Sequence, residues 1–422
     1  MNLDWLIVGL AALTGANYWF RRSVVYPPFL FCGMWLLDAV MHRLQLVDVD
    51  KLHPITLEVV LAGAVLFSFG GLVAFFVPSP LIKARLTVFG RSKRPAKWLQ
   101  YLMLGLLTIG IVIGIRSAIA LAGGIGGGNG LFFAVARHAM IENVEAGRDS
   151  SGLTKYIGTW TIFVAALFLA ARMDRIAWIA TGIAFFACLV SGGRTGLLSL
   201  FSAVTCIVLI KSGREKFISA LRFARWPIAG FVVLFGGMVF LNKNISTGSG
   251  GLIGLAGQFL VEYIVGPLSA LDRVLVHMGD YRGGSNHTFE FFLRIAAALK
   301  IISYNPPPTL DEWINVPFPT NVYTYYRYIV TDFGIPIAIA LTGLIGFLHS
   351  LLFRKAHTGS VIGLYLFSLT MYSVIMVIFD DAYSRFGLYL SAFAFAAIYS
   401  LARSVPRELF RPREEGRSAL PQ

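Results

Sequence analysis

The chain has 422 residues, of which 56% are hydrophobic and 14% charged, with a mean hydropathy of +0.70 and a formal net charge of +14. Soluble domains carry about 25% charged residues, so this composition excludes an ordinary soluble domain and predicts a polytopic membrane protein. The basic residues lie in short loops between apolar segments, which indicates membrane topology and contact with anionic lipid and argues against nucleic-acid binding.

Apolar windows of about 17–25 residues, the length that crosses a bilayer, recur along the whole chain. The first begins three residues in and has neither a basic region before it nor a cleavage site after it, so we expect a retained span and not a signal peptide. The sequence therefore predicts one all-α integral membrane domain over residues 1–422, a polytopic helical bundle. We expect eleven spans, at roughly 3–20, 27–46, 56–78, 99–121, 156–171, 176–193, 195–210, 227–241, 334–353, 359–379 and 386–402.

Charge in the loops predicts the orientation. The loop Ser79–Lys97 carries several Lys and Arg residues and no acid, which marks it as cytoplasmic. Alternation from this loop places the N-terminus on the outer side of the membrane and the C-terminus in the cytoplasm. It also places the basic residues at 21–22, 172–175, 211–225 and 354–355 and in the C-terminal tail on the cytoplasmic side.

The longest polar interruption runs over residues 242–333 and predicts a large outer loop inserted between spans. Two apolar segments within it, Leu252–Leu271 and Phe289–Ser303, are broken by charges and by Pro267. We expect both to be helices lying in the membrane interface. If both crossed the membrane, the total would be thirteen spans and every other loop would keep its side.

Several motifs predict nothing beyond structure. The glycine-rich run Gly123–Gly130 lacks the Gly-Lys-Ser/Thr ending of a phosphate-binding loop and is read as a hinge, followed by a helix near 131–146. Cys32, Cys188 and Cys206 lie in apolar runs, where cysteines are ordinary core residues. No metal-ligand spacing is visible, so no metal or cofactor is expected.

Arg194 lies in the turn Ser191-Gly-Gly-Arg194-Thr-Gly196 between two predicted spans on the outer side. An arginine at the rim of the hydrocarbon is costly unless it is paired, hydrated or extended toward water. It is therefore either a membrane anchor or a guanidinium aimed at a lipid-linked phosphate, for which its planar fork is well suited. Arg116, near the outer end of its span, poses the same choice.

The segment Asn321–Gly334 closes the large loop with four tyrosines, Arg327 and Asp332. Tyrosines can stack on sugar rings while their hydroxyls form hydrogen bonds. The alternative is an aromatic belt at the membrane interface with a structural Arg–Asp pair. Prolines before the segment predict an extended, stiff approach to it.

Two stretches carry a resemblance to a known family. Ser191-Gly-Gly-Arg194-Thr-Gly-Leu-Leu198 resembles the Arg-Thr-Gly-Leu-Leu turn of bacterial O-antigen polymerases, the Wzy-type oligosaccharide repeat unit polymerases. Asn321-Val-Tyr-Thr-Tyr-Tyr-Arg327, followed by Asp332-Phe-Gly334, is similar to the end of their large periplasmic loop. The number of spans and the position of the large loop also agree, so the resemblance covers nearly the whole chain. Pro336 departs from the family pattern, in which a glycine commonly follows Asp-Phe-Gly-Ile.

The resemblance implies a metal-independent glycosyltransferase in the bacterial inner membrane whose active site faces the periplasm. Donor and acceptor would both be undecaprenyl-diphosphate-linked oligosaccharides, and undecaprenyl diphosphate would leave. It also implies a chain-length regulator and a flippase as partners. Arginines would meet the charge on the departing diphosphate: Arg194 and Arg327 first, with Arg116, Arg137, Arg273 and Arg294 in reserve. Substrate contacts are expected from Asn321, Tyr323, Thr324, Tyr326 and His287.

The attacking hydroxyl needs a base or a group that orients it. Asp332 is nearest the motif, and His287, Glu290 and Asp311 remain open, although a lone histidine in a polar loop is commonly just solvated. Two other functions also remain open: a ligase that moves glycan onto lipid A core, and a flippase for the lipid-linked unit. A flippase predicts charges at mid-membrane and repeated halves, whereas here the ionisable residues crowd the outer rim.

Overall fold

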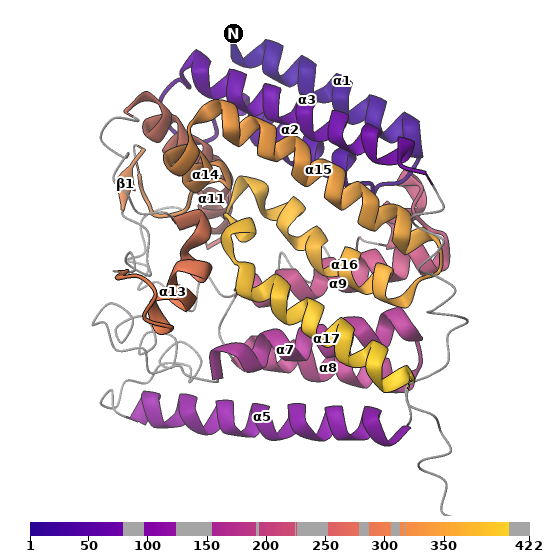
Figure 1. The fold of residues 1–422 in the computed structure, drawn as a ribbon. Helices are drawn as coiled ribbons and strands as arrows, with labels where there is room; N and C mark the ends of the chain where they lie inside the picture. Colours follow the sequence, from indigo (N-terminus) through magenta and orange to yellow (C-terminus); the bar gives the residue numbers. More distant parts are fainter. Residues whose placement is uncertain are drawn as a thin grey trace, which may run out of the picture.

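The computed structural model describes residues 1–78, 97–123, 154–190, 194–223, 225, 252–277, 287–304, 313–316 and 318–404. Nearly all of this is helical (Figure 1). The helices are α1 (Leu3–Arg21), α2 (Pro27–Leu44), α3 (Pro54–Phe76), α5 (Lys97–Gly123), α7 (Thr154–Ala171), α8 (Arg175–Val190), α9 (Arg194–Ser212), α11 (Leu252–Val276), α13 (Glu290–Ala298), α14 (Tyr326–Phe333), α15 (Ile335–His357), α16 (Val361–Ile375) and α17 (Phe386–Ser404). Three short 3₁₀ turns are η1 (His287–Phe289), η2 (Met376–Ile378) and η3 (Ala382–Ser384), and a small antiparallel hairpin pairs β1 (Ile314–Asn315) with β2 (Pro319–Thr320).

The expected spans agree with these helices. Each one that falls on described residues is helical, and the expected span 227–241 lies outside them. Among the described helices, four are long and apolar enough to cross a membrane by length and composition: Pro54–Phe76, Thr195–Ser212, Ile335–His357 and Val361–Ile378. Shorter apolar helices accompany them. The chain is therefore an all-α bundle of membrane-type helices.

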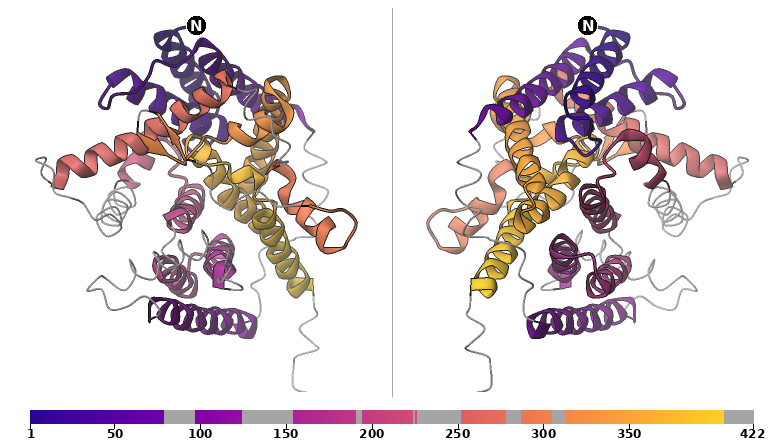
Figure 2. Two further views of the ribbon diagram at one scale, coloured as in Figure 1. Left: turned by 90° about the vertical axis from the view of Figure 1, so that its left-hand side faces the viewer. Right: turned by 90° about the vertical axis from the view of Figure 1, so that its right-hand side faces the viewer.

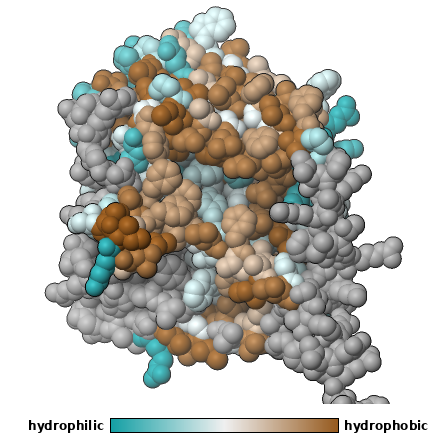
Figure 3. Space-filling view, viewed as in Figure 1, coloured by the Kyte–Doolittle hydropathy of each residue, from teal (hydrophilic) through white to brown (hydrophobic). Residues whose placement is uncertain are grey.

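The bundle has two packed groups with α5 at one edge. α1, α2, α3 and α15 form one group, and α7, α8, α9 and α16 form the other (Figures 1 and 2). α3 and α15 have the most extensive contact, because Gly70 and Gly346 let the two backbones approach with no Cβ between them. Large apolar side chains such as Phe69 and Leu348 point outward, and apolar residues cover much of the face in Figure 3. Such a surface is suited to lipid.

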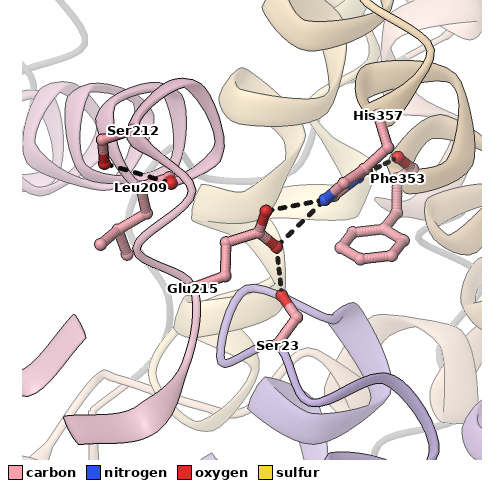
Figure 4. A network of polar contacts seen from close by, with 6 residues as sticks. All are labelled: Ser23, Leu209, Ser212, Glu215, Phe353 and His357. Carbon is pink, nitrogen blue, oxygen red and sulfur yellow. Dashed lines mark hydrogen bonds and ion pairs between the residues drawn. The ribbon is translucent and has the colours of Figure 1, made fainter. Parts of the chain in front are cut away.

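One end of the bundle, here called the Glu215 end, gathers the loops that follow α1, α7, α9 and α15. The backbone oxygen of Glu215 accepts from Val24 N at 2.9 Å, and its carboxylate accepts from Ser23 Oγ and His357 Nε2 (Figure 4). Lys211 Nζ donates to Leu169 O at 2.8 Å. Segments predicted to share the cytoplasmic side therefore do lie at one end of the molecule.

The opposite end, here called the Arg327 end, carries β1, α13 and α14 (left in Figure 1). α11 lies across this end, over the ends of its neighbours and not alongside them (Figure 2). His42, in the last turn of α2, is hydrogen-bonded to Val265 O at 3.1 Å, and Asp272 accepts from Thr56 Oγ1 in the first turn of α3. The helix continues through Pro267, which the sequence had suggested as a break.

Candidate functional site

The Asn321–Gly334 segment forms a short connection and then α14, which runs straight into α15. Gly334, with φ of 80°, joins the two helices in a backbone conformation that favours glycine. Pro336 occupies the first turn of α15, where a missing N–H costs no hydrogen bond. The motif thus stands directly on the end of a long apolar helix, so its backbone is held by the bundle.

Arg327 is the central cation of this segment. It is 8% exposed, and its Cζ lies 3.6 Å from the centroid of the Tyr323 ring and 5.3 Å from that of Tyr328. Tyr323 in turn packs against Ala270 and Val274 of α11. Stacking on an aromatic face stabilises a guanidinium and fixes its plane. Arg327 is therefore held rigidly in the bundle's end.

The neighbouring tyrosines point into the protein. Tyr325 and Tyr326 have no exposed surface, and the Tyr325 hydroxyl is hydrogen-bonded to Thr342 Oγ1 at 2.6 Å. Tyr326 packs against Trp35 and fills the space that a side chain at Gly63 would need. Thr324, also buried, accepts from Arg327 N through its carbonyl at 3.2 Å. In this structure these side chains anchor the segment and do not form an exposed sugar platform.

Asp332 and His287 tie the 3₁₀ turn η1 to α14. Asp332 Oδ2 accepts from Thr288 N at 2.8 Å, and the His287 ring stacks on Tyr328 with centroids 4.3 Å apart. Asn321 is half-buried and follows β2 directly in the chain. The structure thus brings together Tyr323, Thr324, Tyr326, Arg327, Asp332 and His287 from the predicted set.

A turn that sequence reasoning missed lies at the centre of the Arg327 end. Residues 376–386 connect α16 to α17 and contact several other elements. Val377 O accepts from Tyr325 N at 3.1 Å, Tyr263 of α11 packs on Phe379, and Phe289 of η1 stacks on Phe386. We call residues 376–386 the hub turn. The signal that could have found it was the run Asp380-Asp381-Ala-Tyr-Ser-Arg385, densely charged for a short connection between two spans.

Two carboxylates and an arginine occupy the hub turn. Arg385 pairs with Asp380 at 2.6 Å, whereas Asp381 is 5% exposed and its Oδ1 accepts from the amides of Tyr383 and Ser384. Burial raises the pKa of Asp381 to about 7, the charge of Asp380 adds to this rise, and the two amide hydrogen bonds oppose it. Asp381 is therefore poised to exchange a proton near neutrality.

The helix that begins at Arg194 reaches the same turn. The side chain of Arg194 lies outside the described part of the structure, but its backbone is the first residue of α9. Leu198, one turn later, packs against a cluster of Tyr372, Met376 and Ala382. The hub turn therefore touches both motifs, because Tyr325 lies against it on one side and Leu198 on the other.

Comparison with known proteins gives no further identification. No family model, curated protein or solved structure matches the chain. Function is therefore inferred from the chain's own residues.

Three of the reserve arginines lie on other elements than Arg327. Arg116 is exposed on α5, which packs against α7 and α8 at the far edge of the bundle (Figure 1). Arg294 pairs with Glu290 on α13. Arg273 pairs with Asp50 at 3.3 Å and lines a pocket of about 430 Å³ between α11 and the chain before α3. Arg137 and Asp311 lie outside the described residues.

A metal site was not expected from the sequence. Within the described ranges, no three His, Cys, Asp or Glu side chains lie close enough together to hold a metal ion. The described charged groups at the motif and the hub turn include Arg327, Asp332, Asp380, Asp381 and Arg385. This set can bind an anion and accept a proton.

Proposed function

We propose that this protein is an oligosaccharide repeat unit polymerase of the O-antigen type. It would transfer a glycan from one undecaprenyl diphosphate carrier to the terminal sugar of another carrier-bound glycan, releasing undecaprenyl diphosphate. The observation that carries the proposal is the meeting of two motifs distant in sequence, Ser191–Leu198 and Asn321–Gly334, at one hub turn. Those two stretches also carry the family resemblance.

The chemistry of transfer fits the charges at this end. Negative charge grows on the diphosphate as its bond to the anomeric carbon breaks, and preoriented arginines stabilise such charge. Arg327 is preoriented by the Tyr323 ring, and α9 begins with Arg194. In the proposal both guanidinium groups bind the leaving diphosphate. The aromatic residues and Asn321 would position the glycan beside it.

We further propose that the Arg327 end faces the periplasm and the Glu215 end the cytoplasm of the bacterial inner membrane. Eleven spans with a periplasmic N-terminus and a cytoplasmic C-terminus would place the basic loops inside. In this arrangement α11 and α13 lie in the outer interface, consistent with the course of α11 across the bundle's end. Apolar surface on the sides of the bundle and charged residues at its two ends support this orientation.

Cysteine labelling tests the orientation. Cys32, Cys188 and Cys206 are buried, so a cysteine introduced at an exposed position can be read against them. A membrane-impermeant maleimide should label Lys51→Cys in intact spheroplasts and should label Thr358→Cys only after lysis. Both positions are exposed, at opposite ends of the bundle. The reverse pattern would overturn the orientation.

The function is tested by the glycan of a deletion strain. Restoring the wild-type gene should restore a ladder of long chains on gels, whereas Arg194→Ala and Arg327→Ala should leave single repeat units. The matched control is Arg43→Ala, which removes an exposed arginine from the same end, where it pairs with Asp4 at 2.8 Å. Long chains from both arginine variants would discard the roles given to them. Polymer retained on the lipid carrier would indicate a ligase.

A further inference from the structure

Asp381 has one oxygen that is used and one that is not. Its Oδ1 accepts from Tyr383 N at 3.1 Å and from Ser384 N at 3.2 Å, and thereby begins η3. Its Oδ2 is buried and has no hydrogen-bond donor among the residues that the structure describes. A buried acceptor without a donor costs roughly 1–3 kcal/mol. This cost points to a ligand or a proton that completes the hydrogen bonding of Oδ2.

The titratable groups around Asp381 lie on the hub turn itself and on the helices α15, α16 and α17. Asp380 and Arg385 are on the turn itself, Tyr372 is on α16 and Tyr389 on α17. Tyr383 reaches α15, where its hydroxyl is hydrogen-bonded to His349 Nε2 at 3.2 Å. Arg385 forms its ion pair with the neighbouring Asp380, and its charge lowers the pKa of Asp381 only as a smaller effect.

We propose that Asp381 accepts the proton of the attacking hydroxyl in the transfer reaction, an inference that rests on the proposed function. The acceptor sugar's oxygen forms a bond to the donor's anomeric carbon while its proton moves to Asp381 Oδ2. The bond from that carbon to the diphosphate oxygen breaks, and its electron pair leaves with undecaprenyl diphosphate. Asp381 then releases the proton to water, which restores the carboxylate.

Position favours Asp381 over Asp332, and the pKa of Asp381 suits a base. Asp332 Oδ2 accepts from Thr288 N and so helps hold η1 on α14. Asp381 lies beside Ala382, which packs with Leu198 one turn after the start of α9. A base works best when its pKa lies near the working pH, and burial raises the pKa of Asp381 to about 7.

The proposal requires the hub turn to open when the acceptor binds, because Oδ2 is enclosed in this structure. Arg385 extends the cluster to the surface, where 47% of its side chain is exposed. The turn is short, and η3 is only a single 3₁₀ turn. Displacing it would expose Oδ2 to the acceptor.

The test uses the substrate that a deletion strain accumulates, the lipid-linked single repeat unit, extracted and supplied to membranes containing each variant. Asp381→Asn keeps the amide-capping oxygen and removes the proton acceptor, so we expect transfer to fall about 100-fold or more. The control is Asp174→Asn: Asp174 also begins a helix through its Oδ1, which accepts from Ala177 N, but at the Glu215 end. The control should keep the wild-type rate.

The pH profile gives a readout that a merely structural role would not move. The wild-type rate should rise about tenfold per pH unit up to about pH 7 and then level off, and the residual rate of Asp381→Asn should be flat. Asp381→Glu, which keeps a carboxylate, should transfer faster than Asp381→Asn. An Asp381→Asn rate within threefold of wild type, or a flat wild-type profile from pH 5 to 8, would overturn the inference. If wild-type membranes form no polymer at all, the proposed function fails instead.

Discussion

Each end of the molecule holds a carboxylate, half-buried Glu215 at one and buried Asp381 at the other, and their hydrogen bonding differs. At the Glu215 end, both carboxylate oxygens are satisfied: His357 Nε2 lies 2.9 Å and 3.0 Å from them, and Ser23 Oγ also donates (Figure 4). At the Arg327 end, Asp381 Oδ2 is buried without a donor among the described residues. Completed hydrogen bonding stabilises a fold, whereas an incomplete set keeps a group reactive.

The pKa values of these carboxylates move in opposite directions. Burial raises the pKa of Glu215, but the hydrogen bonds from His357 and Ser23 and the charge of His357 outweigh burial and bring it below its ordinary value. For Asp381 burial dominates, Asp380 adds to it, and the pKa rises to about 7. We infer that the Glu215 end holds the helices together and that the Arg327 end carries the chemistry.

Replacing Arg327 should have the largest effect. Arg327→Lys keeps the charge but loses the planar group that stacks on Tyr323, so it cannot bind a diphosphate through two parallel hydrogen bonds. We expect transfer to fall roughly 100–1000-fold, as when a stabilising donor is removed from a transition state. Quantifying polymer formed from extracted lipid-linked repeat units measures this, and a rate close to wild type would show that only the charge matters.

Asp381→Asn should stabilise the folded protein while it removes activity. Because the folded pKa of about 7 exceeds the ordinary value of 3.8, the ionised group weakens the fold at alkaline pH. The stabilising contribution of the protonated form is complete below about pH 4 and is lost as pH rises to 7. Asparagine should therefore raise stability by up to about 4 kcal/mol at pH 8 and hardly at all at pH 4.

Thermal unfolding in detergent at the two pH values measures this difference. Asp174→Asn is the control, and its melting temperature should change equally at both. A loss of stability in Asp381→Asn at pH 8 would mean that the ionised carboxylate stabilises the fold, contrary to the roles assigned to the two ends.

Glu215→Ala should destabilise the folded protein and leave its activity nearly unchanged. It removes the acceptor for Ser23 and His357, so we expect a loss of about 1–3 kcal/mol with little change in the rate per folded molecule. Since the pKa of Glu215 is lowered on folding, its contribution is present above the ordinary pKa and is lost as pH falls below it. Glu58→Ala removes an exposed carboxylate that pairs with the N-terminal amine, and it should leave the melting temperature nearly unchanged.

A glycine substitution at the Arg327 end tests how firmly its anchor is packed. A methyl group at Gly63 would collide with the Tyr326 hydroxyl, so Gly63→Ala should cost about 1–3 kcal/mol and lower activity by shifting the neighbouring Arg327. Gly182→Ala is the control, because no atom of the described neighbourhood lies within 4 Å of the added Cβ. Equal melting temperatures for the two variants would show that Tyr326 is free to move.

Local pattern predicted most of the fold. Apolar windows gave helices wherever they fall on described residues, because crossing length and hydropathy are properties of a single segment. Basic loops predicted to share a side do meet around Glu215. The Asn321–Gly334 motif was identified as a unit, and His287 does stack on its Tyr328 ring, while Asp332 within it accepts from Thr288 N.

The hub turn could not be predicted in the same way. Its importance depends on contacts with Tyr325, Leu198 and Tyr263, which are set by how distant helices pack. Likewise, the tyrosines suggested sugar stacking by type, but only packing against Gly63 and Thr342 shows that Tyr325 and Tyr326 are buried. Composition indicates what a residue can do, and burial decides which of its groups remain available.

The most direct test is the initial rate of chain extension by membranes containing wild type, Asp381→Asn or Glu215→Ala, corrected for folded protein. We expect wild type and Glu215→Ala to form polymer at similar rates, and the rate of Asp381→Asn to be lower by about 100-fold or more. Equal rates for all three variants, or a loss confined to Glu215→Ala, would contradict the division of roles between the two ends.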